Sequence, residues 1–210
     1  MINYLDPVMP VQYGVHGLDG ANSPMRRVTR QVAFESAWDN QRADKVRDLF
    51  DGMADHWHER VSPDRGAPLA DAIDRGDVQR GLTLELGSGI GDSTAYIEDH
   101  VGPTVSADLA MEMLIRAPTD TRRVRADASR LPFADGLASS IVLINALLFP
   151  AEVDRVLAAE GTVVWVNTSG ENTPIFLSSE DLVEALPGAW AGVASRADRG
   201  TWAVLRRAST

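Results

Sequence analysis

The segment from Thr83 to Asp92 reads T-L-E-L-G-S-G-I-G-D and combines residue types that can hold a nucleotide-like ligand. A short apolar stretch carries an acid near its end, Glu85, and three glycines follow at alternating positions, Gly87, Gly89 and Gly91. Glycine leaves the backbone amides open to a ligand and allows the positive φ of tight turns. The Asp-Ser-Thr that comes next favours a helix start. Strand, glycine turn and helix N-terminus in this order predict a cradle for such a ligand.

Three further polar residues follow the glycine turn at intervals of 17 to 19 residues, namely Asp108, Asp127 and Asn145. One strand–helix unit takes about this length, and each of the three lies at the end of a predicted strand. The carboxyl ends of parallel strands lie along one edge of a sheet, so we expect these side chains to converge with Glu85 on one crevice. Ionised carboxylates only accept hydrogen bonds, which suits ribose hydroxyls and an exocyclic amine. Taken singly, each could equally be a turn former or a helix cap.

The segments that must position these residues alternate between strand and helix from about residue 80 onward. Runs such as Ile141–Ile144 and Val163–Val166 are apolar at every position, which is typical of central parallel strands covered on both faces. The pattern predicts an α/β fold with a doubly wound, seven-stranded, mostly parallel sheet. The expected strands are 82–86, 104–108, 122–126, 139–145, 162–167, 188–195 and 201–207, and the expected helices are 92–100, 110–116, 150–159 and 178–186.

The N-terminal third has a different pattern. Residues 1–24 read as irregular, and Ser23-Pro24 is a typical helix start. We expect one helix to about Phe34, a second from Glu35 or Ser36 through Met53, and a short third near Leu69–Arg75. The predicted organisation is an N-terminal arm and helical lid over residues 1–79, followed by a Rossmann-like cofactor-binding domain over residues 80–210.

Composition narrows the function classes. The chain has 210 residues, a formal net charge of −10 and no cysteine. The absence of cysteine excludes disulfides, zinc-thiolate sites and thiol nucleophiles. The acidic charge opposes binding to nucleic acid, and no apolar run approaches the ~18 residues of a membrane span. No signal peptide is evident, so we expect a cytoplasmic protein, and the arginine-rich, lysine-poor usage predicts a bacterial source.

The ordered set of motifs resembles the class I S-adenosylmethionine-dependent methyltransferases, of the methyltransferase domain 11 type. E-L-G-S-G-I-G (85–91) matches the first motif of that family, and S-A-D-L-A (106–110) and D-A-S-R-L-P-F-A-D-G (127–136) resemble its second and third. D-R-V-L-A-A-E-G-T-V-V-W-V (154–166) resembles a later one, so the resemblance covers about residues 80–207. V-R-D-L-F-D-G-M-A-D-H-W (46–57) is similar to a helix of the ubiquinone/menaquinone methyltransferase-like branch.

The resemblance implies S-adenosyl-L-methionine as cofactor and assigns residues to it. Asp108 would hold the ribose hydroxyls, and Leu109 would lie against the adenine. Asp127 and the Ala128 amide would read the adenine edge, while Asn145 would sit near the sulfonium. The remaining cofactor-binding residues that the resemblance implies are Trp57, Glu85, Gly87, Ser88, Gly89 and Gly91.

The sequence departs from the family in three places. Ala159-Glu160-Gly161 replaces a Pro-Gly-Gly turn, the usual Asp is missing from Ala138-Ser139-Ser140, and no long insertion precedes the sixth strand. The cover of a substrate would then come from the N-terminal arm or from a second subunit, which makes a homodimer possible. The expected substrate is a small molecule whose acceptor atom is oxygen, nitrogen or carbon, and a protein acceptor is the alternative.

A general base can help an oxygen or nitrogen nucleophile lose its proton. The candidates are His56 and His58, which follow the second helix, although surface histidines would look the same; His16, Glu59 and His100 are further candidates. A metal site built from His56, His58 and Glu59 lacks the spacing of a His-Glu-x-x-His motif, so we expect no metal.

Two other function classes stay open. An NAD(P)-dependent oxidoreductase would need G-x-G-x-x-G, whereas the third glycine here comes one residue early. A non-catalytic, methyltransferase-like binding domain would show the same motifs without turnover.

Overall fold

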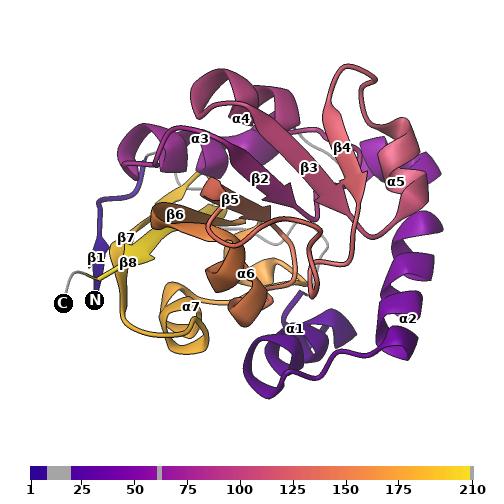
Figure 1. Ribbon diagram of the computed structural model, residues 1–210, viewed down its shortest axis with the longest axis horizontal. Coiled ribbons are helices and arrows are strands. Elements are labelled where there is room, and N and C mark those ends of the chain that lie inside the picture. The colour runs from indigo at the N-terminus through magenta and orange to yellow at the C-terminus, as the bar shows by residue number, and fades with distance from the viewer. Residues whose placement is uncertain (9–19, 61–62, 209–210) are drawn as a thin grey trace.

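Figure 1 shows a computed structural model of the chain, which describes residues 1–8, 20–60 and 63–208. Within these ranges the strands form one eight-stranded sheet in the order β1-β7-β8-β6-β5-β2-β3-β4. Neighbouring strands are parallel except that β8 runs antiparallel to β6 and β7. The strands are β1 (Ile2–Tyr4), β2 (Thr83–Leu86), β3 (Thr104–Asp108), β4 (Arg122–Arg125), β5 (Ala138–Ile144), β6 (Leu157–Asn167), β7 (Trp190–Ala197) and β8 (Gly200–Arg207).

The predicted α/β class and mostly parallel, doubly wound sheet are confirmed, but the predicted strand number is wrong. Strand β1 adds an eighth strand, because Ile2 to Tyr4 pair in parallel with Gly192 to Ala194 of β7. Three residues are too few to show an alternating pattern, and the partner strand lies at the other end of the chain. The predicted irregular N-terminus is therefore wrong at these residues, and the division at residues 79 and 80 stays a prediction.

Helices cover both faces of the sheet (Figure 1). Helices α3 and α4 pack on one face through Leu69, Ala72 and Ile97. Helices α6 and α7 pack on the other face through residues such as Val153 and Leu182. The helices are α1 (Pro24–Glu35), α2 (Asn40–Asp51), α3 (Ala67–Arg75), α4 (Thr94–His100), α5 (Met111–Arg116), α6 (Pro150–Val156) and α7 (Ser179–Ala185), with short 3-10 helices η1 (Gly20–Asn22), η2 (Ala54–Arg60), η3 (Pro63–Gly66) and η4 (Gly170–Asn172).

The central strands are apolar on both faces, as their sequences predict. In β5, Ile141 and Leu143 belong to the core beneath α6 and α7, while Val142 between them belongs to the core beneath α3 and α4. In β6, Trp165 and Val164 divide in the same way. Burial of a large apolar side chain stabilises a fold by about 1.5–3 kcal/mol, so these two strands anchor the sheet.

Two helix boundaries differ from the sequence prediction. The second helix begins at Asn40, because Ser36 adopts a left-handed φ of 51° that ends α1 and Asp39 caps α2 by accepting a hydrogen bond from the Arg42 amide. The predicted helix over 150–159 ends at Val156, since Leu157 pairs with Ala138 of β5 and the residues after it are extended. Alanine and glutamate favour a helix locally, and the sheet pairing overrides this preference.

The order of the strands places a ligand site. The chain leaves β2 toward β3 and β4 on one side, and then crosses to β5 and β6 on the other. The point where the order reverses, between β2 and β5, is where open α/β sheets bind ligands beyond the carboxyl ends of their strands. Helices α1 and α2 lie across this end of the molecule (Figure 1).

Candidate functional site

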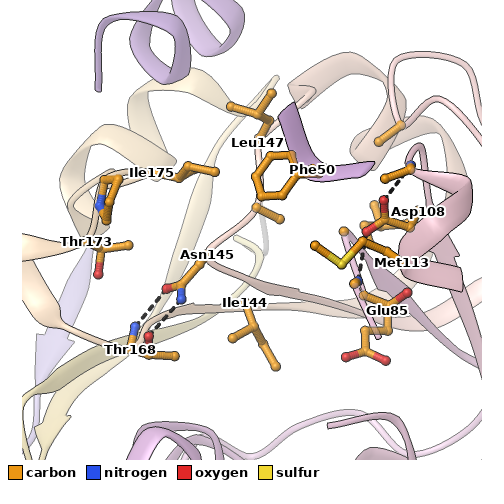
Figure 2. A pocket seen from close by; sticks show the side chains of 18 of the residues that line it. Phe50, Glu85, Asp108, Met113, Ile144, Asn145, Leu147, Thr168, Thr173 and Ile175 are labelled. Atoms are coloured by element: carbon orange, nitrogen blue, oxygen red, sulfur yellow. Dashed lines mark hydrogen bonds between the residues drawn. The ribbon is translucent and has the colours of Figure 1, made fainter. Parts of the chain in front are cut away.

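A cavity of about 1350 Å³ lies at the carboxyl ends of β2, β3 and β5. Glu85, Asp108 and Met113 lie on one side of it, Thr168, Thr173 and Ile175 lie on the other, and Asn145 stands between them (Figure 2). Pockets for a single small ligand usually measure about 300–1,000 Å³, so this cavity has room for a cofactor and a second molecule.

The glycine turn forms one wall of the cavity and has the backbone that the sequence predicts. Gly87, Gly89 and Gly91 have φ values of 69°, 56° and 76°, in the left-handed region that favours glycine. A Cβ on Gly87 would lie 2.8 Å from the Ala146 side chain. Gly87 and Gly89 line the cavity with Ser88, whereas Gly91 is not among the lining residues and packs near Ala117. Gly91 therefore shapes the turn from behind.

Asp108 is fixed by the backbone around it. Its carboxylate accepts hydrogen bonds from the amides of Gly89 and Ala110, both at 2.8 Å. Burial raises the pKa of Asp108, and these backbone donors partly oppose that shift. Each oxygen keeps a second lone pair, so the carboxylate can still accept hydrogen bonds from a ligand. The side chain is thus a preformed acceptor beside the glycine turn.

Glu85 lies below the turn and is 3% exposed. Its Oε2 accepts a hydrogen bond of 2.5 Å from the Thr94 hydroxyl, and burial raises the pKa of Glu85 to about 7. Thr94 is the first residue of α4, and Ser93 before it makes no side-chain cap. Glu85 therefore ties the strand to the helix that follows the glycine turn.

Asp127 is held by the N-terminal helices rather than by its neighbours alone. The Trp38 indole N–H lies 3.0 and 3.1 Å from the two carboxylate oxygens, and the Ser129 amide donates to Oδ1 at 2.8 Å. The Trp38 ring meets Phe149 edge to face, with centroids 5.1 Å apart. Trp38 lies between α1 and α2, where no motif in the sequence marks it.

Asn145 ends β5 in a left-handed conformation, with a φ of 50°. Its amide is paired in both directions with Thr168 at the end of β6: Nδ2 donates to the Thr168 hydroxyl at 2.7 Å, and Oδ1 accepts from the Thr168 amide at 2.9 Å (Figure 2). A non-glycine residue in this region is strained, and the two hydrogen bonds hold it there. The pair closes the floor between the two sides of the cavity.

The region from α2 to η3 forms the cover over the glycine turn. Phe50, Met53 and Trp57 pack against buried Ala54, Ala110 and Met113. Phe50 and Trp57 meet edge to face, with centroids 6.1 Å apart. Phe50 and Met53 thus pack over the turn, whereas Leu49 of α2 is largely exposed.

The histidines proposed as general bases lie away from the cavity. His56 and His58 are exposed and do not line the cavity, and His56 Nδ1 lies 3.0 Å from Glu59 Oε1. His100 ends α4, where its Nδ1 contacts the Tyr96 carbonyl oxygen. His16 lies outside the described residues. Within the residues that the structure describes, no three His, Asp or Glu side chains are grouped to hold a metal.

All cofactor residues that the sequence predicts, apart from Gly91, line the one cavity. Those that the sequence missed come from loops: Trp38 before α2, Arg65 in η3 and Thr168 after β6. Arg196 near the end of β7 and Arg199 of the β7–β8 turn also line it. Tryptophan and arginine in short loops give no periodic signal, so no pattern in the sequence marks them.

The lining fits an adenosyl cofactor. Carboxylates at the ends of β3 and β4 suit a ribose diol and an amine. The buried Ser88 hydroxyl lies in the glycine turn and has no hydrogen-bond partner among the described residues. A buried, unpaired hydroxyl is costly unless a ligand or water satisfies it.

Among the residues that the structure describes, none of the helices has both the length and the apolar character of a membrane span.

Comparisons with known proteins agree with this geometry. Residues 84–165 match the methyltransferase domain family. The DhpI complex with S-adenosylhomocysteine is 18% identical, with a TM-score of 0.65 over 80% of this chain and 98% of that one. A SAM-dependent methyltransferase from Aquifex aeolicus is 14% identical, with a TM-score of 0.58 over 80% of this chain and 98% of that one. The fold is therefore that of the class I S-adenosylmethionine-dependent methyltransferases.

Other matches are shorter. A methyltransferase from Haloferax volcanii, solved in complex with a methyltransferase activator, is 22% identical with a TM-score of 0.48. That match covers 56% of this chain and 59% of the other, so this chain spans little more than half of that protein. No curated protein matches the sequence. The similarity to the ubiquinone/menaquinone branch stays a prediction.

Proposed function

We propose that this protein, which has the fold of the class I S-adenosylmethionine-dependent methyltransferases, transfers a methyl group from that cofactor to a small-molecule acceptor. The observation that carries the proposal is the convergence of the glycine turn, Asp108 and Asp127 on one cavity large enough for two molecules. The family match and the shared fold support the same activity.

The residues of the site have distinct roles in this proposal. Asp108 would accept hydrogen bonds from the ribose hydroxyls, and Asp127 from the adenine amine. When bound, the cofactor supplies an electrophilic methyl group on its sulfonium. The protein must hold a nucleophile in line with that group and exclude water, and such positioning can supply on the order of 7–11 kcal/mol.

The second side of the cavity would receive the acceptor. It combines apolar Ile144, Leu147 and Ile175 with polar Thr168 and Thr173. The size and mixed lining of this space support a small molecule, and the net charge of −10 argues against nucleic acid. The proposal includes a cytoplasmic location, an acceptor atom that is oxygen, nitrogen or carbon, and cover of the acceptor by the N-terminal helices or by a second subunit.

Incubation with methyl-labelled S-adenosylmethionine and a panel of small metabolites tests the proposal. We expect label to pass to at least one acceptor, and to pass more slowly in the Asp108→Ala variant when the cofactor is below saturation. Binding of the cofactor without transfer to any acceptor, across acids, amines, phenols and thiols, would support the non-catalytic alternative. Binding of NAD in preference to S-adenosylhomocysteine would support an oxidoreductase.

A further inference from the structure

Two arginines lie on the side of the cavity that carries Thr168 and Thr173, which is called the acceptor side below. Arg196, near the end of β7, and Arg199, of the β7–β8 turn, both line the cavity. Gly170 lies between the two threonines in the chain, and a Cβ placed on it would be 3.6 Å from Arg196 Nη1 and 2.8 Å from the Arg199 carbonyl oxygen. The turn that carries the arginines therefore packs directly against the segment that carries the threonines.

The charge on the acceptor side is mainly positive. The acid that lines it is Glu171, whose Oε1 lies 3.4 Å from Arg196 Nη2 and whose side chain is 76% exposed, so water screens this pair. Arg26 of α1 adds positive charge behind the segment, because its Nη2 donates to the carbonyl oxygens of Glu171 and Thr173 at 2.5 and 3.1 Å. Asp198 of the same turn is not among the lining residues. In a chain with a net charge of −10, this local positive charge favours an anionic ligand.

Two buried hydroxyls on the acceptor side can donate hydrogen bonds to a ligand. Thr168 is 5% exposed and Thr173 is 1% exposed, and both line the cavity (Figure 2). The Thr168 hydroxyl accepts a hydrogen bond from the Asn145 side chain at 2.7 Å, and the Thr173 hydroxyl accepts one from the Ser169 amide at 3.1 Å. A hydroxyl has one proton beside its lone pairs. Since these bonds use lone pairs, each hydroxyl can give its proton to an oxygen of a ligand.

The acceptor side also lies outside the part of the chain that matches the methyltransferase family. The match covers residues 84–165, whereas the threonines and the arginines follow it in the sequence. The family match therefore assigns no ligand to these four side chains, and their own chemistry has to identify it.

We infer that the methyl acceptor is an organic acid whose carboxylate binds on the acceptor side, an inference that rests on the proposed function. Arg196 and Arg199 bind the carboxylate, because a planar guanidinium matches the two oxygens of that group. Thr168 and Thr173 donate hydrogen bonds to the same oxygens, and the apolar residues beside them contact the hydrocarbon part. The same charges disfavour an acceptor that carries an ammonium group.

Ligand pairs that differ only in this charge test the inference. The probes are 4-hydroxybenzoate and 3-phenylpropanoate, each measured beside its primary amide, and phenyl phosphate as an anion of another class. Calorimetry uses protein saturated with S-adenosylhomocysteine, so that the cofactor end is already occupied. The proteins are the wild type, Arg196→Gln, Arg196→Lys, Arg199→Gln, Thr173→Val and the exposed control Arg80→Gln. Thermal melts confirm that each variant is folded.

We expect the wild type to bind each acid at least about 10-fold more tightly than its amide, the usual effect of a charge-assisted hydrogen bond. Arg196→Gln and Arg199→Gln should each weaken the acids about 10-fold and leave the amides within about 2-fold, while Arg196→Lys should keep part of the preference. Thr173→Val should weaken acids and amides alike, because both offer an oxygen to the hydroxyl. Arg80→Gln should change nothing, and S-adenosylhomocysteine should bind every variant within about 2-fold of the wild type.

The inference is overturned if the wild type binds the acids no more tightly than the amides, or binds neither acid. It is equally overturned if both glutamine variants keep the full preference for the acids, or if Arg80→Gln reduces it as much as they do. Binding of phenyl phosphate alone would replace the carboxylate with a phosphoryl group and so contradict the assignment. A failure of the proposed function looks different, because the wild type would then not bind S-adenosylhomocysteine at all.

Discussion

The two ends of the cavity hold their carboxyl groups in different ways. At the glycine-turn end, Glu85 and Asp108 are fixed by groups no more than 19 positions away in the chain: the Thr94 hydroxyl for the first, and the amides of Gly89 and Ala110 for the second. At the other end, Asp127 takes a hydrogen bond from Trp38, which is 89 residues away. One end is built into the sheet, whereas the other is completed by the N-terminal helices.

This difference indicates that the carboxyl groups at the two ends are held with different rigidity. The hydrogen bonds that fix Glu85 and Asp108 run through the sheet edge, although Phe50 of α2 packs over the turn. Asp127 depends on a contact with Trp38 in the segment between α1 and α2, and such connecting segments open more readily than the sheet. We therefore expect changes at the turn end to have large effects and changes at the Trp38–Asp127 contact to have smaller ones.

The largest effect should come from the charge of Glu85. Burial raises the pKa of Glu85 from 4.5 to about 7. Between these values the unfolded carboxyl ionises while the folded one keeps its proton, so the free energy of unfolding falls as the pH rises. The loss is about 3 kcal/mol. In urea titrations at pH 4.5 and 7.5, Glu85→Gln should lack this loss; an equal pH response in both proteins would contradict the assignment.

Asp108→Ala should have the next largest effect. It removes the acceptor of two backbone amides and the proposed partner of the ribose. We expect cofactor affinity to weaken by roughly 1–3 kcal/mol, with a loss of stability of similar size. Calorimetry with S-adenosylhomocysteine and a thermal melt measure the two. Unchanged affinity in the folded variant would remove Asp108 from the cofactor site.

Trp38→Phe tests the hydrogen bond between Trp38 and Asp127. The variant keeps an aromatic ring near Phe149 and loses the N–H that Asp127 accepts. We expect cofactor affinity to fall by about 0.5–1.5 kcal/mol, less than for Asp108→Ala. Phe149→Leu, which keeps the indole donor, is the matched control and should change affinity less. A loss for Trp38→Phe as large as that of Asp108→Ala would break the division between the two ends.

The smallest effect should follow substitution of His56 and His58 by alanine. Both side chains are exposed and lie outside the cavity lining. We expect the melting temperature to stay within about 1 °C, as for most surface substitutions, and methyl transfer to the acceptor found by the labelled screen to stay within about 2-fold. A collapse of kcat with unchanged cofactor affinity would instead identify a histidine base.

Much of the fold could be predicted because its signals are local. Runs apolar at every position marked β5 and β6, and Ser23 before Pro24 marked the start of α1, where the Ser23 hydroxyl accepts a hydrogen bond from the Met25 amide. Strand β1 could not be predicted, since three residues carry no period and their pairing with β7 is set by the assembled sheet.

Some residues of the site could also be predicted from the sequence, and others could not. Asp108, Asp127 and Asn145 were predictable because the parallel-sheet rule brings strand ends together. Trp38 and Arg65 were not, because each acts from a short irregular segment and its partner is defined only in three dimensions. The sequence thus predicts the part of the site that the sheet builds and misses the part that the covering segments supply.

A structure of the protein crystallised with S-adenosylhomocysteine would show whether the cofactor lies in the cavity beside the glycine turn. We predict the ribose hydroxyls within hydrogen-bond distance of Asp108, with the adenine beside Leu109 and its amine toward Asp127. The contradicting result would be a cavity closed by the protein's own side chains, with the ligand bound elsewhere or absent.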